Sequence, residues 1–523
     1  MTQEFTNTKY ENLSHRDHTR LRMGVLLGSK EATENNIWVL NNNILSKESL
    51  KYSIAMYNSI DEIILNVIDH SNRTKLIKGK GKCDTIKFNF DKETGEIKVF
   101  NNGEGIIIEK VENKDYYIPE LIFSHERSGS NFSNADDKIS AGQNGTGAKL
   151  TNILSKYFII ETSDLKNKLN YYQRFDDGNL IKNKPIIEKL TKVDKDKKNP
   201  YTLVSFLLEY ELFYPDGFTE ELSIILDQLF YTRMNYVSIY LGSGYNVFYN
   251  DIEITNKKLD DLSKLIIDDE DIIKCKLYNK LDKKLNPIDI NIGIYDCQDN
   301  QEQISFINGL VVSNGGSHIK YINKLILENL KSKLEKKLKD KVKITNKMIS
   351  NYLFIFFSGD ILNPDWINQS KTTLSVSEAR FKNLLLDDKV YKQIWSKIED
   401  KIDELYLNKT KDTTTKKTSK LRGIKKYRSA DKAGSNESYK CILIIPEGDS
   451  AESCIKNGLT TNKDLGYKYY GIFNIQGVPL NVRKEIDIKE IKRNDKITYI
   501  IDRKKKLIDN ERFASLVKVL NLN

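Results

Sequence analysis

The stretch "SAGQNGTGAKLTNI" (residues 140–153) is a glycine-rich loop that runs into an apparent helix. Backbone amides in such a loop, together with the positive end of a helix, can hold phosphate groups, and Lys149 adds a positive charge. The stretch is not a P-loop, because Lys149 follows alanine and is not itself followed by serine or threonine. It also lacks the third glycine of the dinucleotide-binding pattern. The sequence therefore predicts a phosphate site of a different class.

Upstream, "DEIILNVID" (61–69) places Glu62 and Asn66 four residues apart. The surrounding run, residues 50–72, has apolar residues three and four apart, which is typical of an amphipathic helix. One face of that helix presents a carboxylate and an amide together. Taken alone, the pair also fits a solvated helix face.

Two further loops carry candidate ligand-binding residues. "NNGEGI" (101–106) follows one strand of an alternating hairpin pattern, and Gly103 and Gly105 would let the backbone approach a flat ligand. A plain turn is the alternative. Further along, "NQSKTT" (368–373) is by itself an ordinary polar loop that carries Gln369 and Lys371.

The remaining pattern indicates mixed α/β structure. Three segments rich in β-branched and aromatic residues, 156–164, 201–210 and 235–250, predict strands of one mixed sheet. A second domain is predicted to begin near residue 251. Its strand-like "ISFINGLVVSNGG", helix-like run 318–343 and strand-like "NYLFIFFSGD" favour an α+β arrangement or a βαβ crossover.

The order of these elements resembles the Bergerat-type (GHKL) ATP fold shared by type IIA topoisomerases, Hsp90 chaperones, MutL and histidine kinases. Four further stretches are similar to the eukaryotic or viral type of topoisomerase II. They are "YYIPELIFSH" (116–125), "EQISFINGLVVSNGGSHIKYI" (302–322), "YKCILIIPEGDSAES" (439–453) and "YYGIFNIQGVPLNVR" (469–483). The resemblance thus covers the ATPase region and the start of a TOPRIM domain, as in the split large subunit of some phage enzymes or an N-terminal fragment.

The resemblance implies an α+β chain of three folded parts. We expect a GHKL ATPase α/β sandwich with an N-terminal dimerisation arm over 1–250 and an α/β transducer domain over 251–408. A basic linker would occupy 409–436, and the N-terminal part of a Rossmann-like TOPRIM domain would occupy 437–523.

The resemblance also implies residue roles. Glu62 would be the general base for ATP hydrolysis, Gln369 and Lys371 would reach the γ-phosphate from the transducer, and Asn66 would hold Mg²⁺. Asn102 matches the position that recognises the adenine amino group. The predicted nucleotide-binding set is Asn66, Arg73, Asn102, Gly103, Gly105, Ser130, Asn131, Gly142, Asn144, Gly145, Gly147 and Lys149.

Some positions depart from the family pattern. Gln143 and Thr146 replace an arginine and a tyrosine in the loop, and Gly129 replaces a serine. His70 occupies a position where an asparagine that contacts nucleotide is usual; a packed or capping histidine is the alternative. His318 is predicted to be a packing residue of the transducer.

The "EGDSA" corner carries one acid of a metal site. A TOPRIM site needs an acid on its first strand and a D-x-D pair on a later strand, because one carboxylate positions Mg²⁺ poorly. Glu447 is the predicted first acid, and no later acids form D-x-D after an apolar strand. The chain is therefore expected to be either a fragment of a larger enzyme or a subunit whose site is completed by another polypeptide.

The composition indicates which kinds of partner and which cellular location are possible. A net charge of +10 permits a polyanionic partner, and the basic residues Lys425, Lys426, Arg428 and Arg483 are predicted to contact double-stranded DNA. A solvated linker is the alternative. The five scattered cysteines indicate reduced thiols, and neither a membrane span nor a signal-peptide core is present in the sequence. We expect a soluble intracellular protein, located with DNA in the host cytoplasm, nucleus or nucleoid.

The functional hypothesis is an ATP-hydrolysing subunit of a type IIA DNA topoisomerase. It would dimerise with a second copy of itself around a DNA duplex, and a partner chain would supply the D-x-D and the cleavage tyrosine. A nucleotide-gated DNA clamp without cleavage activity is the alternative. A chaperone or mismatch-repair ATPase is opposed by "EGDSA" and "PLNVR".

Overall fold

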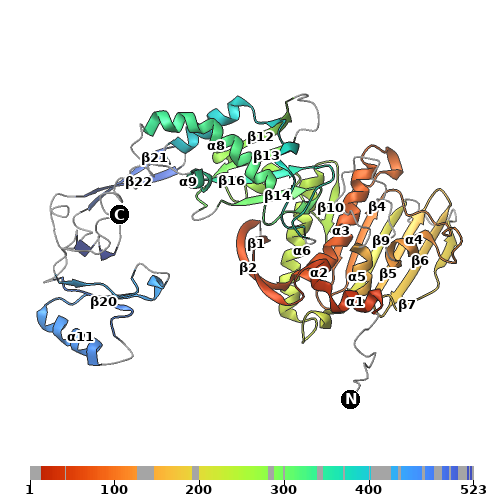
Figure 1. Cartoon of the computed structure of the whole chain (residues 1–523), viewed down its shortest axis with the longest axis horizontal. Coiled ribbons are helices and arrows are strands. Elements are labelled where there is room, and N and C mark those ends of the chain that lie inside the picture. Colours follow the sequence, from red (N-terminus) through yellow and green to blue (C-terminus); the bar gives the residue numbers. More distant parts are fainter. Residues whose placement is uncertain are drawn as a thin grey trace, which may run out of the picture. The chain divides into compact units, whose positions relative to one another are not determined.

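The chain divides into two compact units, residues 1–406 and 407–523, shown in Figure 1. The structure is a computed structural model of the whole chain. It describes residues 13–41, 43–125, 147–190, 200–280, 288–297, 301–338, 346–368, 371–399, 401, 426–433, 437–461, 466–475, 486–493, 496–503, 515–516 and 519–520.

The first part of unit 1 is built on a nine-stranded mixed sheet. Its order is β11-β10-β3-β4-β9-β5-β6-β7, with β8 paired to β6. β10 runs parallel to β3, whereas the other pairs are antiparallel, so the predicted mixed sheet is confirmed. The strands are β3 (Thr85–Phe90), β4 (Ile97–Asn102), β5 (Ser155–Asp164), β6 (Leu169–Asp176), β7 (Ile181–Lys182), β8 (Ile186–Lys189), β9 (Tyr201–Leu208), β10 (Asn246–Tyr249) and β11 (Ile252–Glu253).

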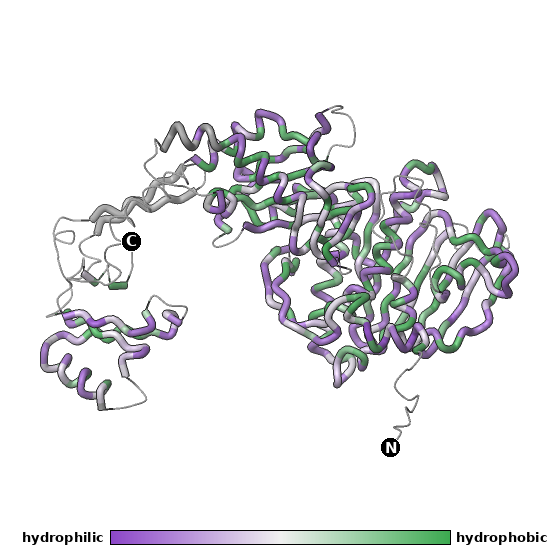
Figure 2. The backbone as a smooth tube through the Cα atoms, in the orientation of Figure 1, coloured by the Kyte–Doolittle hydropathy of each residue, from purple (hydrophilic) through white to green (hydrophobic). Residues whose placement is uncertain are grey.

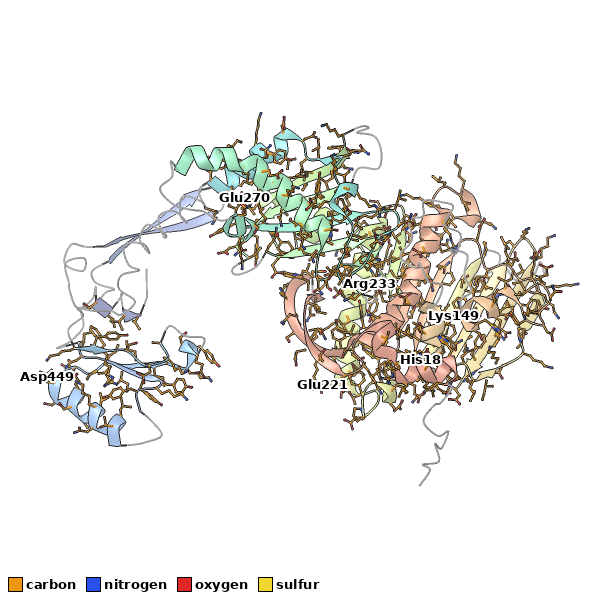
Figure 3. All side chains as sticks on the ribbon, in the orientation of Figure 1. His18, Lys149, Glu221, Arg233, Glu270 and Asp449 are labelled. Atoms are coloured by element: carbon orange, nitrogen blue, oxygen red, sulfur yellow. The ribbon has the colours of Figure 1, made fainter. Side chains whose placement is uncertain are left out.

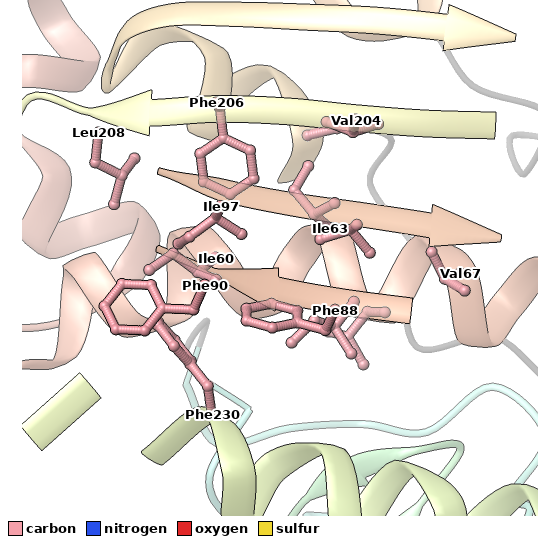
Figure 4. Close-up of a cluster of buried hydrophobic side chains, with 14 of the residues drawn as sticks. Ile60, Ile63, Val67, Phe88, Phe90, Ile97, Val204, Phe206, Leu208 and Phe230 are labelled. Atoms are coloured by element: carbon pink, nitrogen blue, oxygen red, sulfur yellow. The ribbon is translucent and has the colours of Figure 1, made fainter. Parts of the chain in front are cut away.

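Helices pack against this sheet. They are α1 (His15–Leu21), α2 (Met23–Leu27), α3 (Ile54–Thr74), α4 (Ile118–Ser124), α5 (Gly147–Ile153) and α6 (Glu220–Leu241). Helix α3 begins where the Ser53 hydroxyl accepts a hydrogen bond from the Met56 amide, which satisfies one of the free amides of its first turn. Its apolar face, including Ile60 and Ile63, is buried against Phe88 and Ile97 of the strands (Figure 4). Each such side chain contributes about 1.5–3 kcal/mol by leaving water.

One predicted strand is wrong in its first half. Residues 235–241 form the last two turns of α6, and the strand begins only at Asn246. The helix is capped by Thr219 at its start and ends at Gly242, whose φ of 83° suits a glycine. Tyr236 and Val237 are buried within the unit. Tertiary burial therefore overrides the strand preference of these residues.

The second part of unit 1 is a six-stranded sheet with the order β15-β14-β16-β13-β12-β17. β14 and β16 are parallel and are joined through α8, which is the βαβ crossover, one of the two predicted arrangements. The elements are α7 (Leu259–Ser263), β12 (Ile272–Asn279), β13 (Ile288–Ile294), β14 (Gln303–Ile307), β15 (Leu310–Val311), α8 (Ser317–Leu338), α9 (Asn346–Ser350), β16 (Leu353–Gly359) and β17 (Leu384–Leu385).

A hairpin of β1 (Ala32–Asn41) and β2 (Ile44–Ser53) helps join the two parts of unit 1. Leu40 and Leu45 share a buried cluster with Tyr236 of α6 and Phe306 of β14. Figure 2 shows hydrophobic stretches throughout the helices and strands of this unit. The two sheets therefore belong to one continuous folded body. The first twelve residues of the predicted dimerisation arm lie outside the described residues.

Unit 2 contains a small sheet with the order β18-β20-β19. β19 (Ile442–Ile444) runs parallel to β20 (Tyr470–Phe473), and α11 (Asp449–Thr461) lies between them in sequence. β18 (Tyr427–Arg428) pairs with β20, so the linker predicted over 409–436 is shorter at its C-terminal end. The backbone bonds of that ladder explain the difference. A separate hairpin consists of β21 (Ile486–Arg493) and β22 (Lys496–Arg503).

Across the described part of the chain, no helix has the length and apolar character needed to cross a membrane.

Candidate active site

Glu62, in the first part of unit 1, and Lys371, in the second part, form an ion pair. Glu62 lies on α3, and its side chain is 21% exposed. Lys371 lies in the loop after β16, with a φ of 54° and a side chain that is 11% exposed. Its Nζ donates to Glu62 Oε1 at 3.3 Å. The loop after β16 thus places the ammonium group of Lys371 beside the carboxylate of Glu62.

The start of α5 also contacts Glu62. A Cβ at Gly147 would lie 2.0 Å from Glu62 Oε2, so only a glycine allows this approach. The Thr151 hydroxyl donates to the Ser59 carbonyl of α3 at 2.5 Å and fixes the two helices together. Gly147 therefore positions α5 against the carboxylate.

Lys149 is a buried cation on α5 (Figure 3), with 2% of its surface exposed. Burial penalises the charged form and lowers the pKa of Lys149 to about 8. An anion brought next to this side chain would stabilise its charge.

Asn66 lies one turn beyond Glu62 on α3 and is exposed. Among the described residues its amide has no hydrogen-bond partner, so its oxygen is available to a ligand. Arg73 lies in the last turn of the same helix, and its Nη2 is 3.2 Å from His70 Nδ1. Burial, and then the charge of Arg73, lower the pKa of His70 to about 4, which keeps this imidazole neutral.

Asn102 makes structural hydrogen bonds. Its Oδ1 accepts from the amides of Asp84 and Thr85 at 2.9 and 2.8 Å, and its Nδ2 donates to Asp84 Oδ1 at 2.9 Å. Both lone pairs of the amide oxygen are therefore used within the protein. The adenine-recognition role predicted for Asn102 stays a prediction, and this geometry weighs against it.

Asn101, which is not among the predicted residues, lies on the opposite face of β4 from Asn102. Successive side chains of a strand point to opposite faces, so Asn101 shares a face with Ile97 and Val99. That face packs against α3. Asn101 is 5% exposed, and its Nδ2 donates to the Asn102 carbonyl at 2.9 Å. The alternation of "IKVFNN" is the signal that could have found it.

Gly103 and Gly105 are explained by packing within the protein. Gly103 has a φ of +100°, and a Cβ there would lie 2.7 Å from the Cys83 amide nitrogen. A Cβ at Gly105 would lie 2.0 Å from the Ser163 carbonyl oxygen of β5. Close approach of neighbouring backbone therefore suffices to require both glycines.

Several predicted residues lie outside the described residues. In the first unit these are Ser130, Asn131, Gly142, Asn144, Gly145 and Gln369, and in the second Lys425 and Arg483.

Comparisons with known proteins indicate the family that this chain resembles. A family model described as DNA gyrase B matches residues 252–424. The DNA topoisomerase 2 of Pisum sativum is 30% identical over 98% of this chain and 33% of its own length. That of Acanthamoeba polyphaga mimivirus is also 30% identical, over 94% of this chain and 38% of its own.

The chain is similar to the ATPase region of type II DNA topoisomerases. It spans about a third of the length of these curated relatives.

Solved topoisomerase II structures locate the match. The ATPase and transducer domains from Balamuthia mandrillaris superpose with a TM-score of 0.67 at 25% identity, covering 77% of this chain and 98% of that one. The ATPase region of the Saccharomyces cerevisiae enzyme has the same fold, with a TM-score of 0.65 at 24% identity over 76% of this chain and 99% of that one. The predicted GHKL ATPase and transducer fold is thereby confirmed.

The corner predicted to begin a topoisomerase TOPRIM domain lies between β19 and α11. Glu447 is exposed there. Asp449 is hydrogen-bonded by Lys426 and, at 2.8 Å, by Asn474 Nδ2. The contact with Lys426 is the largest cause that lowers the pKa of Asp449.

The neighbouring Glu452 accepts from Asn474 at 2.7 Å and pairs with Lys456 at 2.5 Å. Within the described ranges, no group of three histidine, cysteine or acidic residues could hold a metal ion. The metal-binding role of Glu447 stays a prediction.

Two of the four residues predicted to contact DNA, Lys426 and Arg428, already have contacts within unit 2. Lys426 pairs with Asp449, and the Arg428 guanidinium lies 3.4 Å from the centre of the Tyr467 ring. His318 is buried against Phe357, and its Nε2 lies 3.0 Å from Ser305 Oγ, as expected for a packing residue.

Proposed function

We propose that this chain binds and hydrolyses ATP as the ATPase subunit of a type II DNA topoisomerase. The observation that carries the proposal is the contact between Lys371 and Glu62, which joins the transducer to the ATPase domain at one carboxylate. A carboxylate at a helix face with a cation from a second domain is suited to a reaction at a phosphate.

Glu62 would orient and deprotonate the water that attacks the γ-phosphate. Lys371 would stabilise the negative charge on the phosphate oxygens. Because those oxygens compete with Glu62 for the same ammonium group, ATP binding would separate the pair and leave the carboxylate available as a base. The hydrolytic step is thereby linked to the position of the transducer loop.

The described residues fit a magnesium nucleotide. Asn66 offers an exposed amide oxygen one turn from Glu62, and Mg²⁺ takes oxygen ligands, several of which come from water and substrate phosphates. The ion would neutralise part of the phosphate charge. The buried ammonium of Lys149 lies on the helix that begins against Glu62. Asn101 supplies an amide on the same side of the sheet.

The family match supports proposals about partners. Two copies would close an ATP-operated gate around a DNA duplex, with Lys425, Lys426, Arg428 and Arg483 contributing to DNA contact. Glu447, exposed between a strand and a helix, would be the first acid of a Mg²⁺ site. A cleavage chain would supply the D-x-D and the tyrosine.

The test is ATP turnover by Glu62→Gln. We expect phosphate release to fall by about 10²-fold or more, because general-base catalysis contributes on that order. ATP binding, measured by calorimetry, should persist. Glu188→Gln, an exposed strand residue, is the matched control. Unchanged turnover in Glu62→Gln would refute the assignment.

Relaxation of supercoiled DNA tests the wider role. The chain is mixed with candidate cleavage chains, and the linking number is followed with and without ATP. A topoisomerase subunit gives an ATP-dependent change in at least one mixture, whereas a DNA clamp without cleavage activity gives none.

A further inference from the structure

Tyr240 connects three elements of unit 1. It lies in the last turn of α6, where its hydroxyl donates to Asp360 Oδ1 at 2.6 Å. The same hydroxyl accepts from Asn72 Nδ2 of α3 at 3.1 Å. Asp360 directly follows β16 and begins the loop that carries Lys371. A chain of two hydrogen bonds thus joins α3 to the start of this loop.

The Lys371 loop is fixed to the transducer at both ends. At its start, the Asn308 side chain accepts from the Ile361 amide at 2.8 Å and donates to the Ile361 carbonyl at 2.9 Å. At its end, the Leu374 amide donates to the Gly315 carbonyl at 3.0 Å. Between them the Lys371 amide donates to the Asn368 carbonyl at 3.1 Å. These bonds tie the backbone before and after Lys371 to the transducer.

Helix α3 holds both contacts of the loop at a fixed separation. Glu62 and Asn72 are ten residues apart on it, which corresponds to about 15 Å along a helix axis. Between them the turn at Gly309 packs so closely that a Cβ there would lie 2.6 Å from Ile68 Cγ2. Helix α3 is thus linked to the loop directly at Glu62 and, ten residues further on, indirectly through Tyr240.

We propose that Tyr240 is a positioning residue for Lys371. By holding Asp360 against α3, it sets the distance between the Lys371 ammonium group and the Glu62 site. The inference rests on the proposed ATPase function. Tyr240 does not touch the reacting atoms, so its effect passes through the loop.

The Tyr240 hydroxyl remains able to donate its hydrogen bond to Asp360 at physiological pH. Burial, and then the negative charge of Asp360, raise the pKa of Tyr240 well above its ordinary value. The phenol therefore stays protonated, and remains a donor, across the physiological pH range. This second contact keeps its place while Lys371 exchanges Glu62 for a phosphate.

The first test is Tyr240→Phe in the full chain, which removes the hydroxyl and keeps the ring. We expect kcat for ATP hydrolysis to fall about tenfold, because small displacements of a catalytic group are costly, with KM for ATP changed by less than about twofold. Tyr249→Phe is the matched control, since Tyr249 also donates to an aspartate, Asp227 Oδ1, at 2.6 Å but lies on β10. We expect it to keep the wild-type kcat.

The second test is a double-mutant cycle with Lys371→Met under single-turnover conditions. If Tyr240 acts through Lys371, Tyr240→Phe should slow Lys371→Met by less than about twofold, whereas independent effects would multiply. Asp360→Asn, which keeps an acceptor oxygen, should retain more activity than Asp360→Ala. Thermal melts confirm that each variant is folded.

The outcomes separate the two proposals. Wild-type kcat in Tyr240→Phe, or a full tenfold effect in the Lys371→Met background, would overturn the positioning role while an inactive Glu62→Gln leaves the proposed function standing. Unchanged turnover in Glu62→Gln would overturn the function itself.

Discussion

Glu62 and Glu447 are two acids at predicted catalytic positions, and their surroundings differ. Glu62 is largely enclosed by α3, by Gly147 of α5 and by Lys371 of the transducer loop. Glu447 is exposed, and the acids beside it, Asp449 and Glu452, are paired with lysines and with Asn474. The first region therefore holds its carboxylate in a defined place through burial. In the second, the ion pair between Lys426 and Asp449 lies at the surface, where water and salt screen its charges.

The sharpest way to test this contrast is to remove one partner of a buried ion pair. Asp61 Oδ1 lies 2.5 Å from Arg233 Nε, and Arg233 is 1% exposed. Asp61→Asn would leave the guanidinium without a compensating charge, so we expect the free energy of unfolding of unit 1 to fall by about 3–5 kcal/mol. Urea denaturation followed by circular dichroism measures it.

The control for that variant removes both charges. The double variant Asp61→Leu, Arg233→Met should recover much of the loss, because no unpaired buried charge remains. A single Asp61→Asn variant as stable as the wild type would show that burial does not organise the helices that carry Glu62.

A smaller effect is expected from pH at Lys149, whose pKa is lowered to about 8 by burial. The charged form attracts phosphate, so affinity for a non-hydrolysable ATP analogue should fall about tenfold as the pH rises through about 8. Calorimetric titration at a series of pH values measures this. Lys149→Met should bind weakly without that pH dependence, whereas the exposed-site variant Lys156→Met should keep it.

The free energy of unfolding should change with pH in the direction opposite to the affinity for the ATP analogue. The unfolded chain holds this proton more strongly, with a pKa near the ordinary 10.5, so the free energy of unfolding should rise with pH between about 8 and 10.5. A fall in that window would contradict the burial of a charged Lys149.

The smallest effect is expected at the exposed pair of unit 2. Lys426→Met removes the partner of Asp449, and we expect no resolvable change in the thermal unfolding of unit 2, because surface ion pairs contribute little. The pKa of Asp449 should rise towards its ordinary value, as followed by a carboxylate NMR titration. Lys440→Met, which loses a contact with Glu437 instead, is the control. A large loss of stability would erase the contrast between the two regions.

Local patterns in the sequence predicted much of the first unit. The spacing of Ile60 and Ile64 predicted α3, and the alternating pattern that leads into "NNGEGI" predicted the β3–β4 hairpin. The stretch 235–250 failed in its first half because Tyr236 and Val237 are buried in a helix, where packing outweighs local preference. The motif match points to Asn102, whereas strand alternation places Asn101 on the face of β4 that carries Ile97 and Val99, a distinction that motif matching does not make.

By itself, the sequence predicted the family resemblance, the mixed α/β fold and the helix on which Glu62 lies, because spacing along a helix and glycine placement are local properties. The tertiary structure alone decided which groups meet. Lys371 reaches Glu62 from 309 residues away, Gly147 is required by the Glu62 carboxylate, and Tyr240 links Asn72 to Asp360. These contacts depend on how two sheets and their helices pack, and no local pattern encodes that packing.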